Sequence, residues 1–108
     1  MAFTIKSLAD GQLPAVKGTL YTAPAGVQTI IKTITLVNAD VVSRNINLYL
    51  KRSGGVSRRI TAKDRVLAAG FDGETTQEYT LAAGDMIEGD ASAASVVDFT
   101  ISGVEQTP

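Results

Sequence analysis

The sequence predicts an all-β protein: a single jelly-roll-like β-sandwich domain, residues 1–108, built of about eight short, mainly antiparallel strands. Three observations support this class. Val, Ile and Thr are abundant, turn residues recur about every ten positions, and several segments alternate apolar with polar residues. A chain of 108 residues can also enclose a core, since a domain of this size removes roughly two-thirds of its surface from water.

The expected strands lie between turns rich in Gly, Pro and Asp. They are residues 3–8, 19–22, 27–38, 44–52, 56–61, 75–81, 86–88 and 95–104. Asp10-Gly11 and residues 23–26 are expected to be turns, because Pro presets φ and Gly accepts positive φ. Residues 62–70 fit either one helical turn or a strand, and residues 71–74 are expected to form a loop.

Two strands define the expected core. The segment RNINLYLKR alternates cleanly between apolar and polar positions, and so does the closing segment VDFTIS. The apolar side chains of each strand therefore share one face, which should be turned toward the other sheet. We expect these side chains to form one buried cluster: Ile46, Leu48, Leu50, Val97, Phe99 and Ile101.

The longest expected strand alternates imperfectly. In a regular strand, Ile30, Ile34 and Leu36 would share one face, whereas Ile31 and Val37 would share the other. The strand is therefore either covered on both faces or carries a bulge that flips its register midway.

The composition offers little for catalysis or metal binding. The chain has no Cys and no His, which removes disulfides, thiolate sites, the commonest general base and the commonest transition-metal ligand. No nucleotide-binding glycine motif is present, so we expect no catalytic residue, no cofactor and no metal site. Glu88 and Asp90 could pair as acid and base, or bind calcium with Asp85, but a solvated edge strand is the favoured interpretation.

Charge is distributed unevenly along the chain. Residues 44–65 hold seven Lys and Arg against one Asp, a net charge of +6, whereas residues 66–108 hold eight acidic residues and no basic ones. Either the two segments neutralise each other across adjacent strands, or they meet between subunits or on a partner protein. The candidate partner-binding residues come from the basic segment: Arg44, Arg52, Arg58, Arg59, Lys63 and Arg65.

Nucleic-acid binding and membrane insertion are not favoured. Nucleic-acid surfaces often combine basic residues with stacking aromatics, and Tyr49 is the single aromatic residue of the basic segment. The longest apolar runs are a few residues, too short to span a bilayer. The N-terminal MAFTIKSLADGQ has no apolar run of signal-peptide length, so we expect synthesis in a cytoplasm.

A pattern of turn and strand residues runs from about residue 17 to residue 105. It combines a Y-x-x-P-x-G turn, an I-x-x-I-x-L-x-N strand, an L-x-x-G-D turn and a closing I-S-G-V-E. Its positions are Tyr21, Pro24, Gly26, Ile31, Ile34, Leu36, Asn38, Leu81, Gly84, Asp85 and residues 101–105. The pattern resembles that of small β-sandwich structural proteins of tailed bacteriophages.

The resemblance implies a virion component made in the host cytoplasm: a capsid decoration or cement, head-fibre or tail-associated protein. It brings no catalytic residues and implies a non-enzymatic protein that binds and stabilises the shell. The expected partners are the major capsid protein or another virion protein and further copies of the chain, with apolar contacts from Phe3, Val41-Val42 or residues 91–94. The alternative is a tail or head-fibre module for host-surface carbohydrate, which the scarcity of aromatic residues (6%) disfavours.

Overall fold

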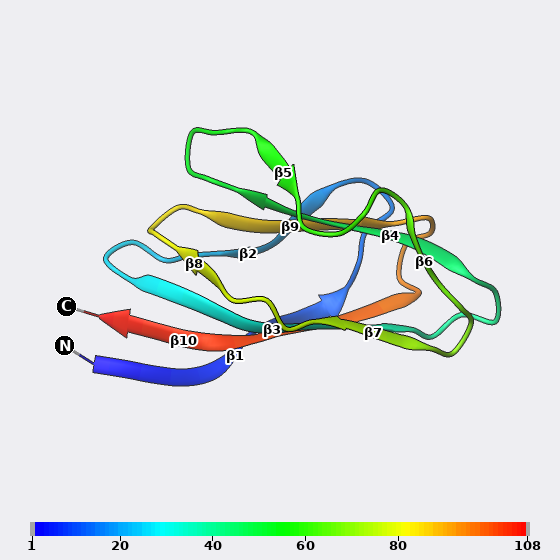
Figure 1. Ribbon diagram of the computed structural model, residues 1–108, viewed down its shortest axis with the longest axis horizontal. Coiled ribbons are helices and arrows are strands. Elements are labelled where there is room, and N and C mark those ends of the chain that lie inside the picture. The colour runs from blue at the N-terminus through cyan, green and yellow to red at the C-terminus, as the bar shows by residue number, and fades with distance from the viewer. Residues whose placement is uncertain (1, 108) are drawn as a thin grey trace.

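The computed structural model describes residues 2–107 as two antiparallel five-stranded sheets packed face to face (Figure 1). Sheet A has the order β1-β10-β3-β7, with β8 also paired to β3, and sheet B has the order β2-β9-β4-β5, with β6 also paired to β4. The strands are β1 (Ala2–Gln12), β2 (Gly18–Thr22), β3 (Gln28–Asn38), β4 (Arg44–Lys51), β5 (Ser57–Arg59), β6 (Arg65–Leu67), β7 (Asp72–Thr75), β8 (Tyr79–Leu81), β9 (Met86–Ala91) and β10 (Val97–Thr107).

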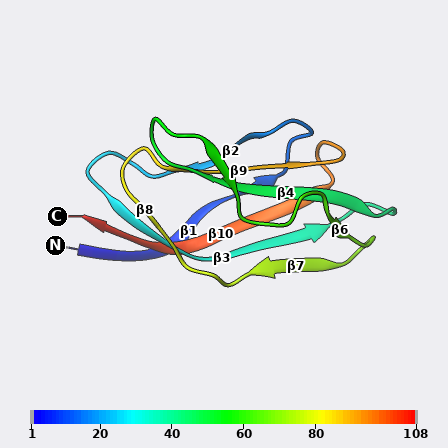
Figure 2. The ribbon, with the colours of Figure 1, turned by 45° about the horizontal axis from the view of Figure 1, so that its top comes forward.

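The strand order is that of a jelly roll. β7 and β8 pair with different parts of β3, and β5 and β6 pair with different parts of β4, so each couple fills one strand position. The eight strand positions are numbered along the chain, with β5 and β6 sharing position 5 and β7 and β8 sharing position 6. Sheet A then has the order 1-8-3-6 and sheet B the order 2-7-4-5, so most successive positions lie in opposite sheets. The predicted all-β sandwich is confirmed, with ten strands at eight positions among the described residues. Both chain ends lie at one end of sheet A, where β1 pairs with β10 (Figure 2).

Three segments differ from the sequence expectation, and a fourth, for which the sequence left two alternatives open, is resolved. The expected Asp10-Gly11 turn lies inside β1, where Gly11 pairs with Phe99 and an added Cβ would lie 3.4 Å from its ring. The expected loop at residues 71–74 is largely strand β7, and the expected strand at residues 75–81 is strand only at its two ends. The ambiguous segment 62–70 contains a strand, β6, and no helix.

A β-bulge explains the imperfect alternation of β3. The pairing of β3 with β10 skips Lys32, which is therefore an extra residue on its strand. Ile31 and Ile34 both face the core with no exposed surface, whereas Ile30 is exposed. The bulge interpretation is confirmed, and the grouping of Ile30 with Ile34 and Leu36 is wrong because the extra residue reverses the alternation.

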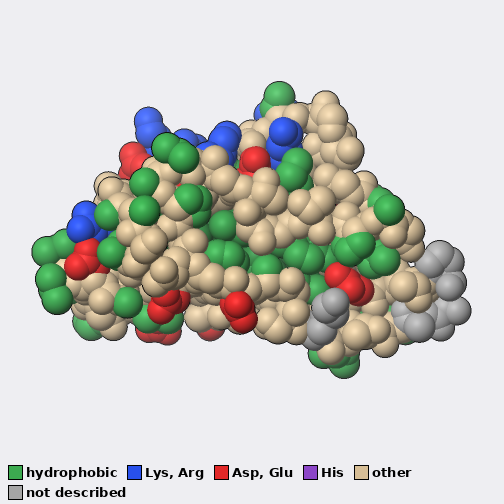
Figure 3. Space-filling model, turned by 180° about the vertical axis from the view of Figure 1, so that it is seen from behind, with side chains coloured by type: hydrophobic (Ala, Val, Ile, Leu, Met, Phe, Trp, Pro, Cys, Tyr) green, Lys and Arg blue, Asp and Glu red, His purple; other side chains and the backbone are tan. Residues whose placement is uncertain are grey.

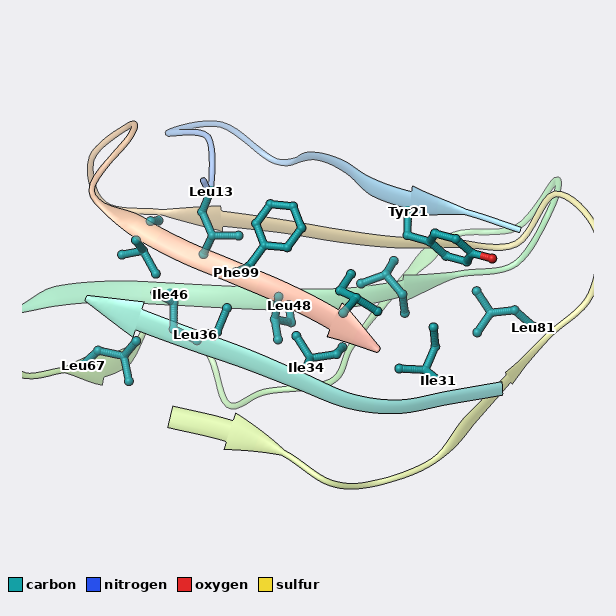
Figure 4. Close-up of a cluster of buried hydrophobic side chains, with 14 of the residues drawn as sticks. Leu13, Tyr21, Ile31, Ile34, Leu36, Ile46, Leu48, Leu67, Leu81 and Phe99 are labelled. Atoms are coloured by element: carbon teal, nitrogen blue, oxygen red, sulfur yellow. The ribbon is translucent and has the colours of Figure 1, made fainter. Parts of the chain in front are cut away.

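The core lies between the sheets and draws side chains from both (Figure 4). Five of the six side chains expected in the cluster are buried, and the sixth, Leu50, is partly buried against them. Tyr21 of β2 extends into the same layer, and its hydroxyl lies 2.9 Å from both Thr29 Oγ1 and Glu105 Oε2. Burial is the main reason that the pKa of Tyr21 rises to about 12.

Asn38 holds the end of the sandwich that lies opposite the termini. Its side chain is fully buried, and Nδ2 donates to the carbonyl oxygens of Val42 and Leu67, both at 3.0 Å. The Oδ1 atom accepts the backbone N–H of Asp40 at 3.0 Å. One side chain therefore bonds the β3–β4 loop, which carries the exposed Val41, to the end of β6.

Candidate interaction surfaces

Three of the six candidate partner-binding residues are engaged within the subunit. Arg44 forms an ion pair with Asp40 (2.7 Å), and Arg52 forms one with Asp85 (2.9 Å). Arg59 donates a hydrogen bond to the side chain of Asn47 on β4. The Arg52 pair joins the basic to the acidic segment, so part of the split charge is neutralised inside one subunit.

Asp85 anchors two turns to each other. Its carboxylate accepts the backbone N–H groups of Ser53 (2.9 Å) and Ala82 (3.0 Å) as well as the Arg52 guanidinium. The Ser53 hydrogen bond is the largest cause of a lowered pKa of Asp85, with Arg52 and Ala82 adding to it and burial opposing it. Asp85 also accepts the N–H of Ala23 on its own carbonyl oxygen (2.9 Å). The turn at residues 21–26 and the turn at residues 81–85, both part of the sequence pattern, are therefore hydrogen-bonded to each other, which gives their residues a structural role.

Tyr49 lies at the centre of a polar network on the outer face of sheet B. Its hydroxyl donates to Asp90 (3.1 Å), Asn47 donates to the same carboxylate (2.9 Å), and Arg59 donates to Asn47 (2.6 Å). The cationic groups of Lys17 and Arg59 lie 4.7 and 5.2 Å from the Tyr49 ring centroid, which is a cation–π geometry. Burial, followed by Asp90, raises the pKa of Tyr49 above its ordinary value.

This network covers the aromatic residue that a nucleic-acid surface would need. Tyr49 is only 9% exposed, so its ring is not free to stack on a base. The sequence alternation places Asn47 and Tyr49 outward, but it does not show what covers them. Lys17 comes from the β1–β2 connection, whose course a strand pattern does not predict. The described residues form no helix, so they contain no helix long and apolar enough to cross a membrane.

Glu88 and Asp90 share the outer face of β9, but each has its own partner. Glu88 accepts the hydroxyl of Ser57, whereas Asp90 accepts Tyr49 and Asn47. β9 lies between β2 and β4, and Glu88 is buried, so the solvated edge-strand interpretation is wrong. Within residues 2–107, no three acidic side chains are grouped to hold a metal ion.

The remaining candidates, Arg58, Lys63 and Arg65, define the basic edge. They lie on β5, on the following loop and on β6, at the border of sheet B, and all three are exposed. Across the described residues their side chains make no hydrogen bond or ion pair. Arg65 reaches across to β7, where a Cβ on Gly73 would lie 3.2 Å from its guanidinium. Figure 3 shows Lys and Arg side chains along the upper margin, where sheet B lies.

An acidic face lies on the outer side of sheet A and was not predicted. We define it by four exposed carboxylates: Asp10, Asp72, Glu74 and Asp98. One cross-strand row runs from Asp10 on β1 to Glu74 on β7, and the next row holds Asp98 and Asp72. With strands about 4.8 Å apart, the first row spans about 14 Å and the second lies about 7 Å from it. The sequence signal was incomplete, because Asp10 lies outside the acidic segment and reaches this face only through the pairing of β1.

The other half of the same face carries four apolar side chains. We call the residues Phe3, Ile5, Ile30 and Val104 the apolar patch. Ile5, Val104 and Ile30 form one cross-strand row, and Phe3 is 64% exposed in the next. A hollow beside this row is lined by Ile5, Ser7, Lys32, Ser102, Gly103 and Val104. The expected apolar contact residue Phe3 is therefore available, as is Val41 at the far end of the molecule.

The class that this fold defines is a single jelly-roll β-sandwich, and the likenesses to known proteins are structural. No family model matches the chain, and no curated protein matches its sequence. The VP2 subviral particle of infectious bursal disease virus matches with a TM-score of 0.58 and 14% identity, over 96% of this chain and 31% of that chain. The T13 particle of that virus matches with a TM-score of 0.59 and 9% identity, over 95% and 30%.

A second likeness covers nearly the whole of both chains. A subunit of the disulfide-linked pili of Bacillus endospore appendages matches with a TM-score of 0.58 and 15% identity, over 97% of this chain and 88% of that chain. At such identities these likenesses show the fold. The chain spans about a third of the viral chains, whereas it has nearly the extent of the pilus subunit.

Proposed function

We propose that this chain is a non-enzymatic structural protein of a tailed-phage virion: a capsid decoration or cement protein that binds the assembled shell and stabilises it. One observation carries the proposal: a single jelly roll accounts for nearly the whole chain, and it is similar to part of a viral capsid protein. The resemblance of the turn-and-strand pattern to tailed-phage structural modules supports the phage setting. A protein of this kind acts through the surfaces that it presents.

The basic edge is the surface proposed to contact another virion protein, which includes a further copy of this chain. Its three cations lack partners within the described part of the chain, so an acidic surface could neutralise them. Val56 and Val66, next to β5 and on β6, are 65% and 63% exposed and would add apolar contact. The proposed partner is the major capsid protein or another virion protein, and the proposed location is the virion after synthesis in the host cytoplasm.

A fibre subunit is the second candidate, because the pilus subunit matches over almost the whole of both chains. Disulfide links are not open to this chain, which has no Cys. A tail or head-fibre module that binds carbohydrate has less support. The large exposed aromatic side chains among residues 2–107 are Phe3 and Phe71, which lie toward opposite ends of sheet A. They cannot form one sugar-stacking platform.

Particles produced with and without the gene test the proposed function. Mass spectrometry of purified particles should find the chain in a fixed ratio to the shell protein. Particles that lack it should release their packaged DNA at a lower temperature, and added purified chain should restore the native value. A chain found only in fibres would favour the second candidate, and a chain missing from purified particles would refute both.

A further inference from the structure

The acidic face and the basic edge belong to opposite sheets of one subunit. The acidic face is the outer side of sheet A, and the basic edge borders sheet B. In Figure 3 most Asp and Glu side chains accordingly lie in the lower half of the molecule, below the Lys and Arg side chains of the upper margin. Two copies in the same orientation can therefore place the acidic face of one against the basic edge of the next.

Among the described residues no ion pair joins either surface to an opposite charge, although Arg65 lies beside Gly73, between Asp72 and Glu74 of the acidic face. The two rows of the acidic face contain no Lys or Arg, and its one side-chain partner is neutral, Gln12 donating to Asp98 at 3.1 Å. Asp72 and Glu74, two residues apart on β7, lie about 7 Å from each other, which is within one Debye length at physiological ionic strength, about 8 Å, so they repel each other. A cationic partner would relieve this repulsion.

We propose that the chain associates with itself, the acidic face of one copy docking on the basic edge of the next. Different surfaces meet in this contact, which makes it heterologous: repetition gives a ring where the rotation closes and an open fibre where it does not. The inference deepens the proposed function, on which it rests for its biological setting. The contact itself is a property of the isolated chain.

Apolar side chains on both surfaces can accompany the charge. The apolar patch adjoins the acidic face, and the exposed Val56 and Val66 adjoin the basic edge. Charge would set the rate and the register of docking, while burial of the apolar side chains would hold the contact. Salt should therefore weaken the association, because the Debye length shrinks from about 30 Å at 0.01 M to about 3 Å at 1 M.

Charge reversal with rescue tests the contact. The face variant carries Glu74→Lys and Asp98→Lys, and the edge variant carries Arg58→Glu and Lys63→Glu. A combined variant carries all four changes, so its net charge equals that of the native chain and it is the matched control. Sedimentation velocity on each purified chain, at low and high salt, measures self-association, and circular dichroism verifies folding.

We expect the native chain to associate at low salt and to dissociate at high salt. Each double variant alone should associate at least about tenfold more weakly, because like charges then meet. An equimolar mixture of the two double variants, and the combined variant alone, should regain association. If a reversed variant fails to fold, the neutral pairs Glu74→Gln with Asp98→Asn and Arg58→Gln with Lys63→Gln replace it and should show the loss.

Three results would overturn the proposal: a native chain that stays monomeric at low salt, variants that associate like the native chain, or a mixture without rescue. A monomeric chain whose edge variant alone loses attachment to purified shells would assign the basic edge to the shell. The proposed function would then stand while the self-association failed. If the chain self-associates but is missing from purified particles, the self-association would stand and the proposed function would fail.

Discussion

Replacing Asn38 with Ala should destabilise the fold by about 2–4 kcal/mol. Three hydrogen bonds of about 3.0 Å would be lost, to the carbonyl oxygens of Val42 and Leu67 and from the N–H of Asp40. A typical hydrogen bond contributes about 0.5–1.5 kcal/mol net, and a buried group left unsatisfied costs about 1–3 kcal/mol. Because a domain of this size has only about 5–15 kcal/mol in total, the midpoint of thermal unfolding should fall by roughly 10–20 °C.

Chemical denaturation of the native chain and of two asparagine variants measures this effect. Asn45→Ala is the matched control, since Asn45 is exposed on the neighbouring β4 and its replacement should change stability by less than about 0.5 kcal/mol. Equal losses for Asn38→Ala and Asn45→Ala would refute the role assigned to the buried amide.

The charge state at the same position gives a second comparison. Asn38→Asp would place a carboxylate against backbone carbonyl oxygens, which raises its pKa in the folded state. Its ionised form then opposes folding, so this variant should be less stable than Asn38→Ala at pH 7. The difference should shrink as the pH falls below the folded pKa toward the unfolded value near about 3.9. An unchanged difference across this range would contradict the geometry.

Three further predictions concern the core, a turn anchor and the bulge. Leu48→Ala should cost about 2–5 kcal/mol in the free energy of unfolding, because Leu48 is 1% exposed in the core; a loss below about 1 kcal/mol would contradict its placement. Asp85→Asn should lower stability at neutral pH, because the pKa of Asp85 is lower in the folded than in the unfolded chain and its ionised form therefore stabilises the fold above the unfolded pKa. That stabilisation is lost as the pH falls through the folded pKa, so the deficit of the variant should close below about pH 4. A deficit independent of pH would show that the charge of Asp85 is not what matters. Gly103→Ala should cost more than about 2 kcal/mol, since its Cβ would collide with the carbonyl oxygen of Ile30 beside the bulge, and a variant of native stability would refute that close approach.

Local alternation predicted the parts of the fold that it controls directly. The inward side chains of β4 and of the first half of β10 repeat every two residues, so these core side chains follow from the sequence. The end of β10 at Thr107 and the burial of Tyr49 on the outer face of β4 do not. The imperfect period of β3 correctly raised the alternative of a bulge. Its position could not be predicted, because the extra residue is defined by the pairing with β10.

The misassigned strands lack a local signal of burial. β7 reads Asp-Gly-Glu-Thr, a sequence rich in turn residues, and it becomes a strand by pairing with the edge of β3. β9 carries Glu88 and Asp90, which fit an exposed strand unless their partners are known. In both cases tertiary pairing overrides local propensity.

The interaction surfaces were predicted only in part, for a related reason. The run of basic residues located the basic edge, but the sequence does not separate Arg58, which is free, from Arg52 and Arg59, which are bound within the subunit. The acidic face depends on the register of four strands, which joins Asp10 to residues far along the chain. Such a face becomes visible only when the sheet order is known.

Electron cryomicroscopy of particles made with and without the gene tests the central claim most directly, that the chain is a structural part of the virion. The account predicts difference density repeated regularly on the shell, each unit matching a sandwich of 46 × 27 × 20 Å. Seen from its long side, each unit should show the two packed sheets, with the basic edge against a neighbouring copy. Identical reconstructions from particles with and without the gene would contradict the account.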